Sequence, residues 1–96
     1  PDTADKKHQL SIFLRMYSPQ TRPYIAFHSD ICRYTCVVAL NDSREYDGGR
    51  FVMIADNRLQ IAPWQAGKAL LHAGNLIHGV SKLTQGTRYS LVMFVN

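Results

Sequence analysis

Short apolar runs and apolar–polar alternation follow one another along most of the chain, and no stretch keeps a helical period over ten residues. The segment "LSIFLRMY" at 10–17 is rich in β-forming residues and ends at the turn-prone "SPQTRP". "TCVVAL" at 35–40 is β-branched and apolar and stops at "NDS", whereas Gly48-Gly49 lead into another apolar run. The pattern predicts short strands separated by tight turns.

The C-terminal half continues in the same way. "RLQIAPW" is followed by "AGKALLHAGNLIHGV", where glycines interrupt short apolar runs, and the chain closes with the strongly β-prone "TRYSLVMFVN". About seven strands in so short a chain predict an all-β sandwich or barrel. We expect residues 10–96 to form one core domain, and residues 1–9, with His8, to be a solvated lead-in or the end of an upstream element.

Composition narrows the class of protein. The chain has 96 residues, of which 46% are hydrophobic and 19% charged, a balance typical of one globular domain. No apolar run approaches the roughly 20 residues of a membrane span, and no signal-peptide pattern is present. Because the sequence starts without methionine, we expect a piece of a longer protein. The net charge of +4 is scattered along the chain, which argues against a nucleic-acid partner.

The stretch "YIAFHSDICRYT" places His28 and Asp30 among apolar and β-forming residues. On a strand, side chains two positions apart share a face, so these two groups could contact one ion together. A hydrogen-bonded core histidine, or a plain His–Asp pair, is the structural alternative for this motif taken alone.

Two residues farther along favour a metal site. His78 lies in "GNLIHGV", and Arg88 follows ten residues later in "RYSLVMFV". A His-x-Asp motif, a distant histidine and then an arginine is the sequence form of a two-histidine, one-carboxylate facial triad, the ligand set of non-haem iron oxygenases. The sequence therefore predicts His28, Asp30 and His78 as metal ligands.

At these residues the chain resembles the iron(II)- and 2-oxoglutarate-dependent dioxygenases, which share a double-stranded β-helix, a jelly-roll also found in cupins. The stretches that carry the resemblance are "MYSPQTRPYIAFHSD", "ALN", "EYDGG", "LLHAG", "LIHGV" and "GTRYSLVMFV". They are most similar to the procollagen lysyl hydroxylases and their prolyl hydroxylase relatives. In that family, helices ahead of the core buttress the larger sheet, and few such residues are present here, so we expect exposed apolar sheet and poor solubility or dimerisation.

The resemblance implies a set of roles. Arg88 would bind the far carboxylate of 2-oxoglutarate, because a guanidinium offers a planar fork to a carboxylate. Ser90 and Tyr17 would complete that end of the pocket, although plain strand or barrel packing also explains both. His72 is interpreted as lining or bracing the site rather than binding iron, and Tyr46 and Trp64 as packing or loop residues.

The activity implied is hydroxylation of an unactivated C–H bond with Fe(II), 2-oxoglutarate and O2, releasing succinate and CO2, with ascorbate as a further cofactor of the family. A peptidyl lysine or proline is the first choice of substrate. N-demethylation of protein or nucleic acid uses the same site, and a non-catalytic jelly-roll that binds a metal or ligand is the alternative from another class. Compartment stays open: the secretory lumen for a collagen-type hydroxylase, the nucleus or cytoplasm otherwise.

Overall fold

The structure, a computed structural model, describes residues 9–96; His8 and almost all of the expected lead-in lie outside this part. The described residues form ten strands and one short 3-10 helix, joined by loops. Their bounds are β1 Leu10–Tyr17, β2 Ile25–His28, β3 Tyr34–Ala39, η1 Ser43–Glu45, β4 Tyr46–Asp47, β5 Phe51–Ala55, β6 Arg58–Ile61, β7 Ala69–Ala73, β8 Ile77–Val80, β9 Gln85–Gly86 and β10 Arg88–Val95. No helix of residues 9–96 is long and apolar enough to cross a membrane.

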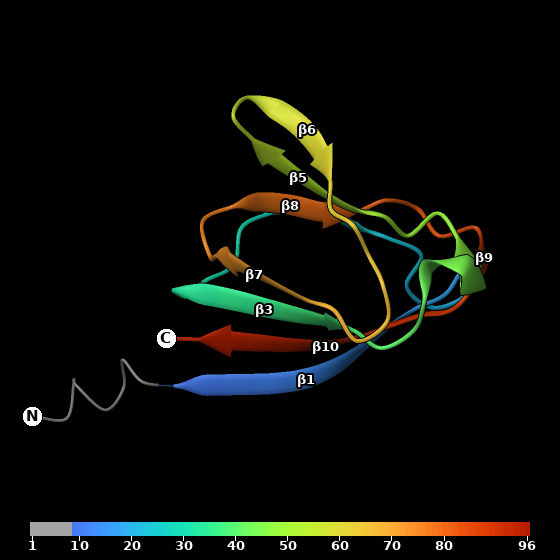
Figure 1. The fold of residues 1–96 in the computed structure, drawn as a ribbon, viewed down its shortest axis with the longest axis horizontal. Helices are drawn as coiled ribbons and strands as arrows, with labels where there is room; N and C mark the ends of the chain where they lie inside the picture. Colours follow the sequence, from blue (N-terminus) through green and yellow to red (C-terminus); the bar gives the residue numbers. More distant parts are fainter. Residues whose placement is uncertain (1–8) are drawn as a thin grey trace, which may run out of the picture.

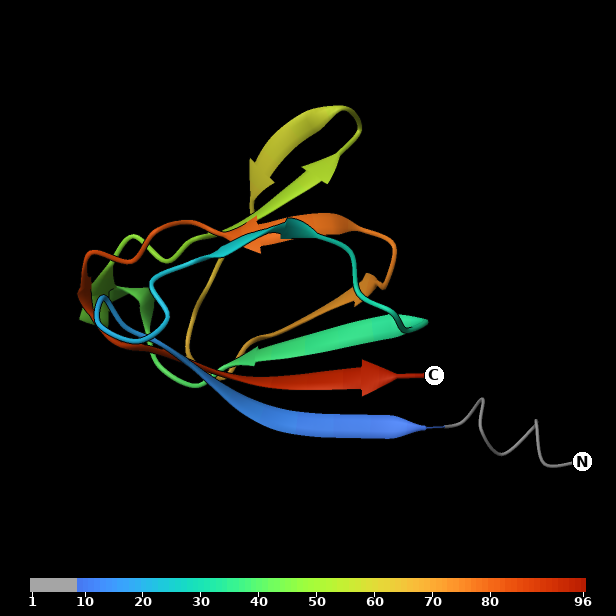
Figure 2. The ribbon, with the colours of Figure 1, turned by 180° about the vertical axis from the view of Figure 1, so that it is seen from behind.

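Two four-stranded antiparallel sheets face each other (Figures 1 and 2). The larger sheet has the order β1-β10-β3-β7 and the smaller one β2-β8-β5-β6. Hydrogen-bonded neighbours such as β1 and β10 come from opposite ends of the sequence, with Leu10 opposite Val95 and Tyr17 opposite Arg88. This arrangement is a jelly-roll, so the predicted all-β double-stranded β-helix is confirmed.

One end of the barrel is closed by a small apolar cluster. Tyr17, Tyr46, Val80 and Leu83 are buried there against one another, beside the two-residue strands β4 and β9. Gly48 has a φ of 75°, and a Cβ at this position would lie against the carbonyl of Lys82. Only glycine allows the loop at Gly48 to approach the loop at Lys82 so closely, which explains the first glycine of the Gly48-Gly49 pair.

The predicted strands match the observed ones closely, apart from the one that carries the His-x-Asp motif. β2 ends at His28, and Asp30 follows it in the connection to β3. The premise that strand alternation places both side chains on one face is therefore wrong for Asp30. Other contacts bring its carboxylate back to His28.

Candidate metal centre

His28 and His78 are direct cross-strand partners on β2 and β8 of the smaller sheet. Their ring centroids are 4.4 Å apart. The Nδ1 of His28 lies 2.7 Å from the carbonyl of Ala26, and the Nδ1 of His78 lies 2.9 Å from that of Leu76. Because a carbonyl can only accept, each Nδ1 carries the hydrogen, and each Nε2 keeps a lone pair for a ligand.

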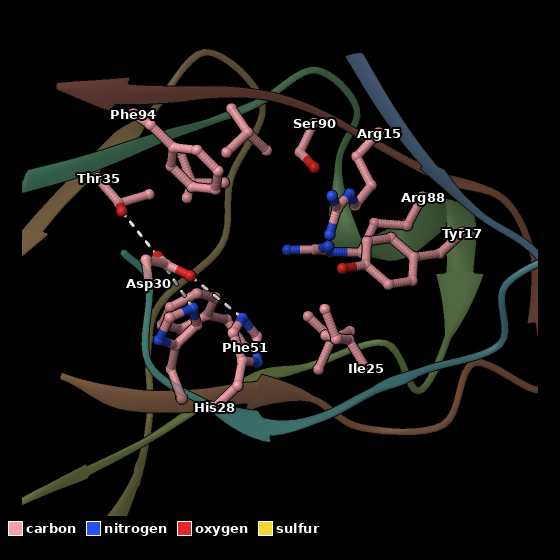
Figure 3. Close-up of a pocket in the computed structure, with 14 residues that line it drawn as sticks. Arg15, Tyr17, Ile25, His28, Asp30, Thr35, Phe51, Arg88, Ser90 and Phe94 are labelled. Atoms are coloured by element: carbon pink, nitrogen blue, oxygen red, sulfur yellow. Dashed lines mark hydrogen bonds and ion pairs between the residues drawn. The ribbon is translucent and has the colours of Figure 1, made fainter. Parts of the chain in front are cut away.

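Asp30 is positioned from outside its own strand. Its backbone N–H donates to the carbonyl of Gly74 at 2.8 Å, which ties the loop after β2 to the turn between β7 and β8. A Cβ on Gly74 would collide with the carbonyl of Cys32, so only glycine permits this approach. The hydroxyl of Thr35 on β3 donates to Oδ2 of Asp30 at 2.7 Å, as the close-up in Figure 3 shows.

The carboxylate of Asp30 consequently faces both imidazoles. Its Oδ1 is 3.3 Å from Nε2 of His28, and its Oδ2 is 3.5 Å from Nε2 of His78. One ligand atom from each of the three residues lies within 4.8 Å of the others. Two imidazole nitrogens and one carboxylate oxygen grouped in this way fit a facial triad, which leaves adjacent coordination positions open.

Thr35 is a site residue that the sequence analysis missed. It is 1% exposed, and its hydroxyl fixes the orientation of the Asp30 carboxylate. Side chains outside the ligand set commonly tune a metal site in this way. A signal was present in the sequence, because strand alternation makes Thr35, Val37 and Ala39 the inward series of β3 and Thr35 is its only polar member.

Burial lowers the pKa of His78 below its ordinary value. The interaction with Asp30 opposes this shift but is smaller than the effect of burial. His78 is therefore neutral near pH 7, which is the form that binds a metal. Phe51 stacks on the ring of His78 with a centroid distance of 5.3 Å and supports its orientation.

The other end of the same pocket is built by β1 and β10. Arg88 and Ser90 are each 1% exposed, and Tyr17, opposite Arg88 in the register, is buried as well. The guanidinium carbon of Arg88 lies 4.1 Å from the ring centroid of Trp64 and 5.0 Å from that of Tyr17. Two aromatic faces thus hold the cation in place. Trp64 lies on a loop, as expected, but it also contacts this pocket residue.

Arg88 has unused hydrogen-bonding capacity. Its Nε and Nη2 are buried and have no hydrogen-bond partner among residues 9–96. Burial lowers the pKa of Arg88, with nearby Tyr17 and Tyr46 acting in the opposite sense. A guanidinium remains charged even so, and a buried charge with free donors is costly unless an anion pairs with it. This end of the pocket is suited to a carboxylate.

His72 lies beside the centre rather than in it. Its ring centroid is 4.6 Å from that of His78, and its Nδ1 is 2.8 Å from the carbonyl of Ala73. The metal-ligand group found among residues 9–96 contains His28, Asp30 and His78 without His72. This position agrees with the bracing role expected from the sequence.

Comparison with known proteins finds relatives of this chain. No family model matches it. Procollagen-lysine,2-oxoglutarate 5-dioxygenase 1 of Mus musculus is 38% identical over 87 residues, which are 88% of this chain and 12% of that protein. A procollagen lysyl hydroxylase and glycosyltransferase of Acanthamoeba polyphaga mimivirus is 36% identical over 90 residues, 88% of this chain and 10% of the viral protein. The resemblance to procollagen lysyl hydroxylases is confirmed. The chain spans about an eighth of the length of the curated relatives it matches.

Solved structures similar to this lysyl hydroxylase-like chain share its fold. A prolyl-4-hydroxylase of Pseudomonas putida has a TM-score of 0.78 and 21% identity, covering 94% of this chain and 53% of the bacterial one. A cupin domain of Bordetella pertussis has a TM-score of 0.63 and 9% identity, covering 91% of this chain and 81% of the cupin chain. At these identities the likeness establishes the jelly-roll architecture, and the chemistry has to be argued from the site itself.

Proposed function

We propose that the chain is the catalytic core of an Fe(II)- and 2-oxoglutarate-dependent dioxygenase that hydroxylates an unactivated C–H bond. The observation that carries this proposal is the grouping of His28, Asp30 and His78, whose ligand atoms lie within 4.8 Å of one another. The lysyl and prolyl hydroxylases among the similar proteins support it. A ferrous ion bound there would, together with 2-oxoglutarate and O2, supply the oxidising chemistry that amino acid side chains lack.

The three ligands would hold the ion by their Nε2 and carboxylate oxygen atoms. Nδ1–H donation to Ala26 and Leu76 keeps both rings in the ligand tautomer, and Thr35 restrains the carboxylate. Two neutral imidazoles and one carboxylate leave a site with a ferrous ion at a net charge of about +1. An incoming carboxylate neutralises that charge.

Arg88 would bind the far carboxylate of 2-oxoglutarate, in the pocket that it shares with the three ligands (Figure 3). Its unpaired Nε and Nη2 are the donors for that contact. Ser90 and Tyr17 lie beside it and offer hydroxyls to the same anion. Apolar residues such as Ile25, Val80 and Val92 line the same cavity and exclude water from the reacting centre.

A peptidyl lysine is the substrate we propose, with proline as the close alternative. Its support is the names of the relatives, which are procollagen lysine hydroxylases in mouse, worm and virus. A prolyl hydroxylase of the same fold from Trichoplax adhaerens has been solved in complex with a peptide fragment, at a TM-score of 0.75. A peptide is therefore the first substrate class to test.

A non-catalytic cupin-like module is the second candidate, because cupin domains match this fold over most of their own length. Such a module would bind a metal or ligand without turnover. Arg88, whose buried Nε and Nη2 have no hydrogen-bond partner within residues 9–96, favours the enzyme over a module that binds only a metal, because such a module has no use for a second charged group at the far end of the pocket.

Asp30→Ala tests the proposal directly. Removing the anionic ligand should abolish tight Fe(II) binding under anaerobic conditions and, with it, the weak visible charge-transfer absorption that appears when Fe(II) and 2-oxoglutarate bind together. Asp47→Ala, which removes an exposed carboxylate from β4, is the control and should leave both signals unchanged. Full iron binding and full absorption in Asp30→Ala would place the metal elsewhere, whereas iron binding without 2-oxoglutarate binding in the unsubstituted chain would favour the cupin-like module.

A further inference from the structure

Arg15 is a second cation in the pocket that no role above accounts for. It lies on the edge strand β1 and lines the same cavity as Arg88 and the three metal ligands. In the register of β1 and β10, Arg15 is opposite Ser90 and Tyr17 is opposite Arg88. Two guanidinium groups and two hydroxyls thus occupy four adjacent positions on the inner face of one sheet. Figure 3 shows both arginines extending inward from that sheet.

Neither arginine is neutralised by a carboxylate in the part of the chain that the structure describes. Within residues 9–96, no carboxylate lies within 4.0 Å of Arg15 or Arg88, and the ion pairs found there involve Asp30 and Asp42 with other partners. Asp30 is the one acid among the pocket-lining residues, and both imidazoles already contact it. The guanidinium of Arg15 rests on the ring of Phe13, with 5.0 Å between its carbon and the ring centroid. This contact directs the side chain without supplying an anion.

The spacing allows both cations to reach one carboxylate. Arg15 and Arg88 are diagonal neighbours across β1 and β10, and diagonal positions in an antiparallel pair are roughly 7–8 Å apart at Cβ, within reach of long side chains. A carboxylate has two oxygens with about four lone-pair sites, so one guanidinium fork leaves acceptor capacity for another donor. Arg15 is half-buried on the edge strand, so its guanidinium can reach the remaining lone pairs of that carboxylate from the edge of the sheet.

We propose that Arg15 is a second cosubstrate-binding residue that, together with Arg88, grips the far carboxylate of the dicarboxylic cosubstrate. This inference rests on the proposed function and adds a specificity determinant to it. Two cations at the far end make the pocket select ligands that end in a carboxylate over neutral ligands of similar length, because a neutral end would leave two desolvated charges unpaired.

The experiment uses glutarate, a five-carbon dicarboxylate without the keto group, titrated into the metal-free full chain. Trp64 is the only tryptophan of the chain and stacks on Arg88, so its fluorescence reports an anion at this end without iron and without turnover. Calorimetric titration measures the same affinity independently.

In Arg15→Gln the dissociation constant of glutarate should rise about tenfold, the size expected for one charge-assisted hydrogen-bonded contact. Arg15→Lys, which keeps the charge but loses the fork, should fall between Arg15→Gln and the unsubstituted chain. Arg58→Gln on the β5–β6 hairpin removes an exposed positive charge outside the pocket and should change the constant by less than about twofold, as expected for a screened surface charge. A thermal unfolding curve confirms that each variant is folded.

The outcomes separate the two proposals. Unchanged glutarate affinity in folded Arg15→Gln, combined with lost affinity in Arg88→Gln, overturns the role of Arg15 and leaves the dioxygenase proposal intact. A folded chain that binds Fe(II) but neither glutarate nor 2-oxoglutarate contradicts the proposed function itself.

Discussion

The two faces of the larger sheet depart from those of an ordinary sandwich, whose outer face is polar and whose inner face is almost wholly apolar. Its outer face is apolar and open: on β1 alone, Ile12 is 55% and Leu14 63% exposed, and Tyr34 and Leu71 are exposed on β3 and β7. Its inner face mixes apolar residues with the polar residues Arg15, Tyr17, Arg88, Ser90 and Thr35; the apolar ones include Val37, Val92 and Phe94. Antiparallel sheets with one solvated face usually read apolar inside and polar outside.

The polar groups on the inner face and the apolar groups on the outer face each need a partner. The inner polar groups cost stability unless an anion or a metal satisfies them, so their presence indicates a ligand site. The outer apolar groups lie on neighbouring strands of one sheet rather than singly, and such a patch usually marks a surface that another part or partner covers. The exposed apolar sheet expected from the sequence is present, and self-association of the isolated chain stays a prediction. Single substitutions on each face test separately whether the inner polar groups serve a ligand site and whether the outer apolar groups serve an interface.

Thr35→Val is the change with the largest expected effect, and it makes one inner position apolar at nearly constant volume. Loss of the 2.7 Å hydrogen bond frees the Asp30 carboxylate. Fe(II) affinity should fall about tenfold or more, the usual cost of losing a partner that orients a ligand. Anaerobic equilibrium dialysis measures it.

Thr84→Val is the matched control, because Thr84 is exposed and lies outside the described strands. Its iron affinity should equal that of the unsubstituted chain. If Thr35→Val also kept full affinity while folded, the polar inner position would be a packing feature and not a support for the metal site.

The strands of the large sheet were predictable from the sequence, and the placement of Asp30 was not. β1 and β10 coincide with apolar, β-forming runs whose ends are marked by turn residues. Asp30, by contrast, is positioned by a backbone bond to Gly74 and a hydroxyl on β3, both far from it in the chain or on another strand. The alternation of residues along a strand carries no information about such contacts. The prediction that Asp30 lies beside His28 is correct, but its reason, a shared strand face, is not.

Sequence patterns are equally limited for the arginine end of the pocket. Arg88 could be proposed from its offset to His78 and from a family resemblance, but Arg15 lies on a strand whose pattern alone leaves the inward face undecided. The register of β1 against β10 is what places Arg15 opposite Ser90 inside the barrel. A one-residue slip would have exchanged Arg15 for Leu14 or Met16, so strand pairing rather than composition decides which side chains line the site.

Leu14→Gln makes the opposite change, replacing an apolar side chain with a polar one on the outer face of β1. If exposed residues of this face meet in a dimer, removing one buried leucine should raise the dissociation constant of that dimer about fivefold to tenfold, as the transfer of a leucine side chain from water suggests. Analytical ultracentrifugation over a concentration series measures the change. Iron and glutarate affinities should stay the same, because Leu14 faces away from the pocket. Unchanged association in a chain that does dimerise would move the contact to another surface.

The smallest expected effect is a pH dependence from His78, which lies on β8 of the smaller sheet, opposite the inner face of the larger one. Burial lowers the pKa of His78 in the folded chain, so the unfolded chain binds a proton near pH 6.5 that the folded chain resists. The folded state then holds fewer protons, and the free energy of unfolding of the metal-free chain should decrease as the pH falls from about 7 toward 5, levelling off below the lowered pKa. Urea unfolding followed by Trp64 fluorescence at each pH should show a shallower decrease in His78→Gln than in the unsubstituted chain. Leu14→Gln should keep the pH dependence of the unsubstituted chain, since it introduces no titrating group. If His78→Gln showed the same pH dependence as the unsubstituted chain, His78 would take up its proton as readily in the folded state as in the unfolded state.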